Sequence, residues 1–403
     1  MNCVPGHSRI PARALFAASI ALIVFAPLRS LAEYPSVDLH NPVIRMKIYL
    51  PDTSYGYYRS CRFDWSGMIA SLTYEGHTVY GEWQTPHYPQ KPDHGIGPCE
   101  EFGMENPPGY ESAAPGETFC KIGVGALVKE SYESYQFNDT FDILDHGRWH
   151  IQADSSTLET THELSLTSGY GYTYTKTIVV ASDAPSFTIQ HLLTNTGSIS
   201  INTNHYNHNF TIIDDEHIGS SYRVTFPFSI QPLSSIQQSF HSYASVSGDT
   251  IALMRSLTGG KTLWAQFEDV PGGSASNGFS VTNTESGIRI YCTGDAPVAL
   301  YRFWAHEMAI CPEPYISIDL DPGESMNWSA TYTIGSVEQN IRYFPRISCE
   351  RSWDVTQSHS TYNLLGRISA HESNFRFPSG VTLYARTAQQ NQDHPIRVVE
   401  VQH

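Results

Sequence analysis

The sequence has few long apolar runs and few helical patterns. After its first thirty residues, no stretch approaches the roughly 20 apolar residues that a membrane-spanning helix requires. Amphipathic stretches with a period of 3.6 residues and flanking caps are scarce as well. The chain is therefore expected to consist mainly of strands.

Basic residues are also scarce. The 403 residues include 24 lysines and arginines against 40 aspartates and glutamates, which gives a net charge of -16. Without a basic stripe to neutralise phosphates, the chain is a poor candidate for binding nucleic acid or an anionic membrane, and a neutral ligand fits better. There is no fixed-period repeat and no glycine-rich phosphate loop. Gly123-Val124-Gly125 is only a GxG fragment, which is typical of a turn or a strand kink.

Cysteine is infrequent and irregularly spaced. Of seven cysteines, Cys3 lies in the N-terminal segment, and the others are Cys61, Cys99, Cys120, Cys292, Cys311 and Cys349. Six cysteines in an exported protein permit three disulfides, although no connectivity follows from sequence. Their spacing does not resemble a zinc framework. We therefore predict neither a metal ligand nor a cofactor.

The N-terminal segment predicts export. Arg9 and Arg13 precede an apolar run over residues 14–28, and small residues follow up to Ala32. This is the pattern of a secretory signal peptide, with cleavage expected after Ala32. The predicted organisation is a signal peptide over 1–32, a β-sandwich domain over 33–335 and an extension of unknown role over 336–403. The expected location of the mature chain is secreted or periplasmic.

Most of the remaining chain has the pattern of short strands and turns. Residues 68–80 alternate around a Glu75-Gly76 turn, and residues 169–180 alternate aromatic, threonine and β-branched side chains. The predicted fold is all-β, with two large packed antiparallel sheets. Residues 85–118, rich in proline and glycine, are predicted to form a long irregular connection.

The most regular of these strand patterns has two histidines, His205 and His208, near its C-terminal end. Residues 187–213 are predicted to form two strands joined by a turn at Thr194–Gly197. Alternation places His208 on a face with aromatic neighbours and His205 on the opposite face. His208 is either a core histidine with satisfied hydrogen bonds or an acid/base group, because histidine titrates near neutrality.

Glu313 is the second candidate. It lies between Pro312 and Pro314 in an otherwise apolar strand. Partial desolvation would raise its pKa and make it a better proton acceptor near neutrality. The alternative is an edge-strand glutamate held by a backbone N–H group or an arginine.

Taken in order, these segments resemble the aldose 1-epimerase (galactose mutarotase-like) superfamily. The resemblance covers roughly residues 40–335 and rests on the segments 67–72, 164–175, 203–210 and 311–314 and the Asp321–Glu324 turn. The chain resembles a divergent branch. The resemblance implies one large β-sandwich, the galactose mutarotase-like supersandwich, with a sugar-binding cleft on one sheet.

The resemblance also implies a mechanism. His208 would act as the general acid and protonate the pyranose ring oxygen, while Glu313 would act as the base on the anomeric hydroxyl. Ring opening, rotation about the C1–C2 bond and closure would give the other anomer. We expect the two groups on opposite sides of the acetal centre, with a monosaccharide between them. His205 is the rival for the acid role.

Five residues are candidates for substrate binding: Arg62, Glu101, Lys121, His205 and His306. Three of them have a plainer interpretation. Arg62 could form a structural salt bridge, and Lys121, which stands where the family has a histidine, could be an ordinary strand residue. Glu101, beside Glu100 in the predicted loop, could bind hydroxyls or a cation, or be simply solvated. Tryptophans such as Trp83 and Trp304 could stack on a sugar or fill the core.

The leading hypothesis is an exported isomerase of aldose 1-epimerase type, acting on a monosaccharide or glycan. Polysaccharide lyase or glycoside hydrolase chemistry on the same scaffold remains open, because fold does not determine chemistry. A third possibility is a carbohydrate-binding protein without catalytic activity.

Overall fold

A computed structural model describes Met1, residues 34–230, 235–236 and 238–337, and three strands near the C-terminus. The chain divides into two units, Met1–Phe344 and Pro345–His403. Residues 2–32 of the predicted signal peptide lie outside the described residues. None of the helices in the described part of the chain is long and apolar enough to cross a membrane.

The larger sheet of the first unit has ten antiparallel strands. Its order is β16 (Ala244–Ser247), β17 (Thr250–Leu253), β14 (Tyr222–Thr225), β19 (Gly278–Asn283), β20 (Ile288–Gly294), β23 (Ser325–Ser336), β12 (Ser186–Asn195), β11 (Gly171–Val180), β10 (Thr157–Ser165) and β9 (Arg148–Ala153). Its central strands are the longest, as expected for residues that alternate aromatic and β-branched side chains.

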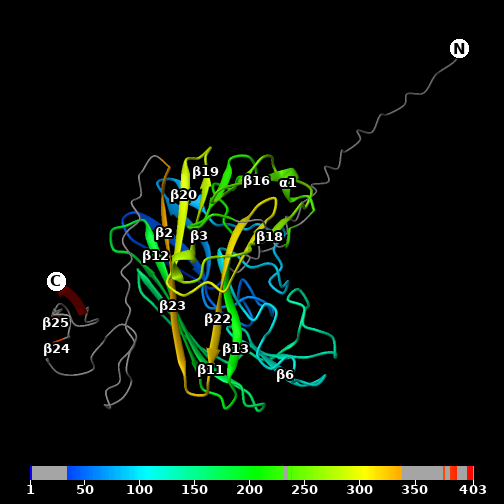
Figure 1. Cartoon of the computed structure of the whole chain (residues 1–403), viewed down its shortest axis with the longest axis vertical. Coiled ribbons are helices and arrows are strands. Elements are labelled where there is room, and N and C mark those ends of the chain that lie inside the picture. The colour runs from blue at the N-terminus through cyan, green and yellow to red at the C-terminus, as the bar shows by residue number, and fades with distance from the viewer. Residues whose placement is uncertain are drawn as a thin grey trace. The chain divides into compact units, whose positions relative to one another are not determined.

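A six-stranded sheet packs against it. Its order is β15 (Ser235–Ile236), β18 (Leu263–Gln266), β21 (Leu300–Ala305), β22 (Ile310–Leu320), β13 (Ile201–Asn209) and β5 (Pro98–Phe102). β13 and β22 run side by side (Figure 1), with Tyr206 opposite Tyr315. Contacts such as the Tyr332 hydroxyl with the Asn209 side chain, at 2.8 Å, join the two sheets face to face. The prediction of an all-β fold with large antiparallel sheets is confirmed.

Smaller elements complete the part of the chain that the structure describes. A four-stranded sheet contains β1 (Ser36–His40), β2 (Ile44–Tyr49), β3 (Met68–Tyr74) and β4 (His77–Val79), and a three-stranded sheet contains β6 (Thr118–Lys121), β7 (Gly125–Val128) and β8 (Ile143–Asp145). Two short helical turns are α1 (Phe240–Tyr243) and η1 (Ser274–Ser276). In the second unit β24 (Phe375–Arg376), β25 (Thr382–Thr387) and β26 (Arg397–Gln402) form an antiparallel sheet.

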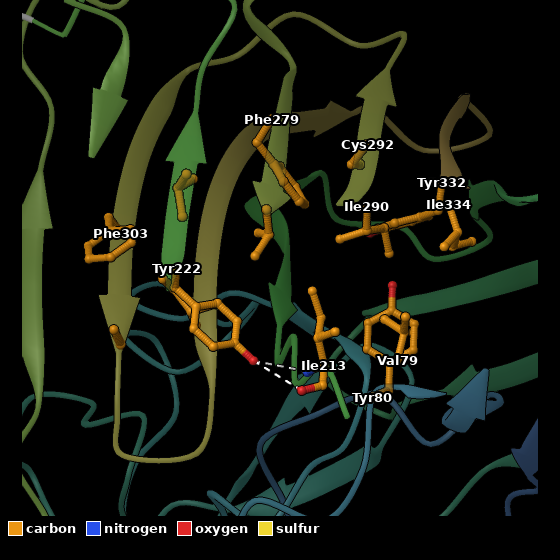
Figure 2. Close-up of a cluster of buried hydrophobic side chains, with 14 of the residues drawn as sticks. Val79, Tyr80, Ile213, Tyr222, Phe279, Ile290, Cys292, Phe303, Tyr332 and Ile334 are labelled. Atoms are coloured by element: carbon orange, nitrogen blue, oxygen red, sulfur yellow. Dashed lines mark hydrogen bonds between the residues drawn. The ribbon is translucent and has the colours of Figure 1, made fainter. Parts of the chain in front are cut away.

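Part of the space between the layers is filled by a continuous apolar core. Figure 2 shows Phe279, Ile290 and Ile334 of the ten-stranded sheet in this cluster. Tyr222 is fully buried there. Its hydroxyl accepts a hydrogen bond from the backbone N–H of Ile213 at 3.2 Å and lies 3.3 Å from the backbone C=O of the same residue, to which it can donate. The ring of Tyr222 adds apolar area to the core, and its hydroxyl group keeps hydrogen-bond partners.

Three of the predicted local structures differ in how far they agree with the fold. The Glu75-Gly76 turn is present, with positive φ at both residues, as a tight hairpin turn requires. The strands predicted on either side of Thr194–Gly197 also form, but β12 and β13 belong to different sheets. The prediction that residues 85–118 form an irregular connection is wrong in part, because β5 lies within them and pairs with β13.

The cysteines are not oxidised in the described part of the chain. Cys61, Cys99, Cys120, Cys292 and Cys311 are all buried free thiols, and Cys349 lies outside the described residues. The even cysteine count therefore does not reflect three disulfides. Burial among apolar side chains explains their use, because a free cysteine packs as a small hydrophobic residue.

Gly97, directly before β5, offers a test of this arrangement. Its φ is +66°, and a Cβ added there would lie 2.2 Å from the carbonyl oxygen of Ile69. Gly97→Ala should lower the free energy of unfolding by more than about 2 kcal/mol, measured by urea denaturation. Gly76→Ala is the matched control, because Gly76 also has positive φ but open space around it, and should cost about 1 kcal/mol. Equal losses would contradict the close contact at Gly97.

Candidate active site

A cavity of about 770 Å³ opens on the six-stranded sheet. Its wall includes Tyr206 and His208 from β13, Glu313 from β22 and Arg302 from β21. These side chains share one face because Arg302 is paired directly with Glu313 across β21 and β22. The volume is typical of a small-molecule site.

His208 and Glu313 are in contact in this wall. The Nε2 atom of His208 lies 3.3 Å from Oε1 of Glu313, and both side chains are buried. Among the described residues, Nδ1 of His208 and Oε1 of Glu313 have no hydrogen-bond partner. The second carboxylate oxygen of Glu313 receives only a long bond, at 3.4 Å, from the Tyr315 hydroxyl. Polar atoms left in this state are unusual in a core and indicate a site prepared for a ligand.

Burial changes the proton affinity of both groups. It raises the pKa of Glu313 to about 8, although Arg62 and Arg302 act in the opposite direction. Burial also lowers the pKa of His208 well below its usual value, and the positive charge of Arg62 adds to the effect. Burial therefore favours the uncharged form of both groups, which places the titratable proton of the pair on Glu313.

Aromatic rings surround the histidine. His208 stacks on Phe210 at 4.0 Å between ring centroids and meets Trp304 edge to face at 5.3 Å. Trp83 stacks on Phe210, and His306 lies parallel to Trp304. The rings hold the imidazole in one orientation and form an apolar wall of the cavity.

Arg62 connects the cavity to a buried ion cluster. Its Nε donates to Glu101 at 2.8 Å, its Nη2 donates to the Tyr206 hydroxyl at 3.0 Å, and Nη1 pairs with Asp93. Glu101 also receives a bond from Lys121 at 3.0 Å. Burial works against ionisation of Glu101, but Arg62 and Lys121 prevail and lower its pKa.

Arg302 forms the other charged part of the wall. It lies over the ring of Tyr315, donates from Nε to Gln266 at 3.1 Å and pairs with Glu105. The side chains of Asp93 and Glu105 are 48% and 60% exposed. Arg62 and Arg302 therefore each form an ion pair with a carboxylate that is in contact with solvent. Polar ligand groups could exchange with these partners at little cost.

A second buried polar cluster lies between the two sheets. Oε1 of Glu100 is bonded to Nε2 of His191 at 2.8 Å, and Oε2 is bonded to the Lys176 ammonium and the Tyr174 hydroxyl, both at 3.0 Å. Burial opposes ionisation of Glu100, but His191 and Lys176 lower its pKa well below the usual value. His205 joins this cluster, with Nε2 4.0 Å from Glu100.

The structure separates the residues that the sequence singled out. Arg62, His208, His306 and Glu313 line the cavity. His205 instead faces the cluster between the sheets, and Glu101 and Lys121 are fully buried beneath Arg62. The interpretation of Glu100 and Glu101 as loop residues is wrong, because both lie in β5 and neither is solvated. Three participants were missed, Arg302, Lys176 and His191, since none of the three stands in a distinctive local pattern.

The geometry of the pair also differs from expectation. His208 and Glu313 do not face each other across a gap wide enough for a sugar. They are neighbours on adjacent strands, because β13 and β22 continue in register from the Tyr206–Tyr315 pair. A substrate would approach both from the same side.

The comparisons with known proteins concern the fold. No protein-family model matches the sequence, and no curated protein matches it. The solved structures that resemble the chain include an aldose epimerase homologue from C. elegans, with 12% identity over 76% of this chain and 100% of that one and a TM-score of 0.45. They also include a galactose mutarotase-like protein from Clostridium acetobutylicum (11% identity, 75% of this chain and 95% of that one, TM-score 0.45) and the Slr1438 protein from Synechocystis (9%, 75% and 96%, TM-score 0.46). At these identities no activity, substrate or site residue is carried over.

The raised pKa of Glu313 predicts that this residue destabilises the fold. The protonated form of Glu313 is compatible with burial, so its full contribution to stability is present below pH 4.5. That contribution is lost as the pH rises through about 8, because the buried side chain is penalised when it ionises. Glu313→Gln, which cannot ionise, should therefore gain stability over the wild type across that interval, by up to about 3 kcal/mol at pH 7. Urea unfolding of both proteins at pH 5 and pH 7 measures the difference. A difference that does not grow with pH would show that the carboxyl group is not desolvated.

Proposed function

We propose that this protein is a carbohydrate-active enzyme that interconverts sugar anomers by opening and closing the hemiacetal ring. The observation that carries the proposal is the contact between Nε2 of His208 and Oε1 of Glu313, 3.3 Å apart in the wall of a cavity, where burial favours the uncharged form of both groups. Such a pair can give one proton and take another in the same step.

The side-by-side arrangement suits this reaction. The ring oxygen and the anomeric oxygen of a sugar are bonded to the same carbon, so an acid and a base that reach both must themselves be neighbours. In the proposed step Glu313 protonates the ring oxygen while His208 removes the proton from the anomeric hydroxyl. The C1–O5 bond breaks, and the anomeric carbon becomes an aldehyde.

Ring closure reverses the two roles. After rotation about the C1–C2 bond, the Glu313 carboxylate takes the proton from the C5 hydroxyl as the oxygen attacks the aldehyde. The His208 imidazolium gives its proton to the carbonyl oxygen, and the pair returns to its starting state. This assignment inverts the roles suggested by the family resemblance, because the pKa order puts the resting proton on Glu313. Either assignment requires a single shared proton.

The rest of the wall supports a sugar as ligand. The rings of Trp83 and Trp304 offer an apolar surface, and the guanidinium groups of Arg62 and Arg302 offer donors to hydroxyl groups. The cationic and anionic groups in the wall balance, because each arginine is paired with an exposed carboxylate. A neutral aldose or the end of a neutral glycan therefore fits best.

Other carbohydrate chemistry has less support. Glycoside hydrolysis usually needs two carboxyl groups beside the scissile bond. Here Glu313 is next to a histidine, and the other carboxylates in the wall, Asp93 and Glu105, are held by Arg62 and Arg302. We also propose, from the pattern of residues 1–32, that the chain is exported.

Substitution of the pair tests the proposal. His208→Asn and Glu313→Gln should each lower kcat/KM for anomer exchange by about 10²–10⁴-fold, because each removes one proton-transfer group. The assay is NMR exchange or polarimetry on freshly dissolved α-glucose and α-galactose, with the spontaneous rate subtracted.

The chain offers a matched control. His150 and Glu163 form a similar pair, 3.8 Å apart, but both are exposed on the ten-stranded sheet. His150→Asn and Glu163→Gln should keep the wild-type rate. Sugar binding without turnover by the wild type would leave a binding protein, and release of reducing ends or unsaturated products from polysaccharides would favour a hydrolase or lyase.

The pH dependence of the reaction follows from the same proton. Above about pH 8 Glu313 loses it, and kcat/KM should fall about tenfold per pH unit. The rate should stay level down through pH 6.5, because His208 takes up a proton only well below that value. A profile of the enzymatic rate from pH 5 to pH 10 measures both limbs. A rate that rises between pH 7 and pH 9 would contradict the assignment of the proton to Glu313.

A further inference from the structure

The cluster around Glu100 contains a set of side chains that no part of the proposed reaction uses. Donor atoms of Glu100, His191 and His205 all lie within 4.8 Å of one another, and all three residues are buried. They come from β5, β12 and β13, so the set bridges the six-stranded and ten-stranded sheets.

Hydrogen bonding leaves His205 unexplained. The side chain is 2% exposed, and in the described part of the chain its Nε2 has no hydrogen-bond partner, although it points toward Glu100 from 4.0 Å. A buried imidazole nitrogen without a partner costs roughly 1–3 kcal/mol.

The surroundings of the other two donors match those of metal ligands. Nδ1 of His191 faces the backbone carbonyl of Trp328 at 3.2 Å and can donate to it, and an ion would replace the 2.8 Å contact that Nε2 now makes with Oε1 of Glu100. The second oxygen of Glu100 is held by Tyr174 and Lys176. Metal-bound histidines and carboxylates usually have such partners, which orient the ligand and tune its basicity.

We propose that Glu100, His191 and His205 bind a divalent transition metal, best matched by Zn²⁺. Two imidazole nitrogens and a carboxylate oxygen form a typical zinc set, and the side-chain amide of Asn207, whose nitrogen now lies 3.2 Å from Glu100, can supply a fourth ligand through its oxygen. Lys176 keeps its contact with Asp64, at 3.4 Å. The site is closed, so the ion would cross-link the two sheets and take no part in catalysis.

Zinc content of the full chain tests the proposal. Protein dialysed against a chelator and then incubated with Zn²⁺ should retain one ion per chain by mass spectrometry of the metal, and its Tm should rise by several degrees. His205→Gln should lose the tightly bound ion and the rise in Tm. His208→Asn is the control, since it removes another buried histidine outside the cluster and should keep both.

A measurement on the wild type covers the case in which the His205 variant does not fold. X-ray absorption at the zinc edge should show two imidazoles in the coordination shell. Absence of retained zinc, equal zinc in the wild type and His205→Gln, or a shell without imidazole would overturn the proposal. None of these readouts depends on enzymatic activity, so failure of the anomer-exchange assay leaves this test unaffected.

Discussion

Two adjacent carboxylates on β5 impose the main constraint on this fold. Glu100 and Glu101 are both fully buried, and a charged group in the interior is tolerated only when it is paired and hydrogen-bonded. Alternation along the strand sends the two side chains to opposite faces, so each face needs its own cations. Lys176 neutralises Glu100 between the sheets, where His191 adds a hydrogen bond, while Arg62 and Lys121 neutralise Glu101 beneath the cavity. The position of Arg62 in the cavity wall is a consequence of this pairing.

Local pattern predicted much of the fold and part of the site. The positions of the Glu75-Gly76 turn and of the strands around His208 follow from residue types and alternation, which act over short distances. The same alternation separated His208, on the cavity side, from His205, between the sheets. The desolvation of Glu313 was also expected from its proline and apolar neighbours, because local sequence and burial agree there.

The features that could not be predicted depend on partners distant in sequence. The proline-rich neighbourhood of β5 indicates a loop, and the strand forms because β13, about a hundred residues later, pairs with it. Lys176 and His191 stand in ordinary alternating strands, and only the assembled sandwich brings them to Glu100. The contact of His208 with Glu313 likewise depends on the register of β13 with β22, which the sequence does not specify.

The change of sheet between β12 and β13 has a consequence for how the chain folds. Strands that follow each other closely in sequence contribute to opposite layers, while the neighbours of β13 are β5 and β22, each about a hundred residues away along the chain. Closing such long loops costs entropy before the contacts form, and high contact order slows folding. During synthesis the six-stranded layer must wait for β22 to leave the ribosome, so an N-terminal fragment ending before residue 310 would expose the edge of β13 to pairing with other chains.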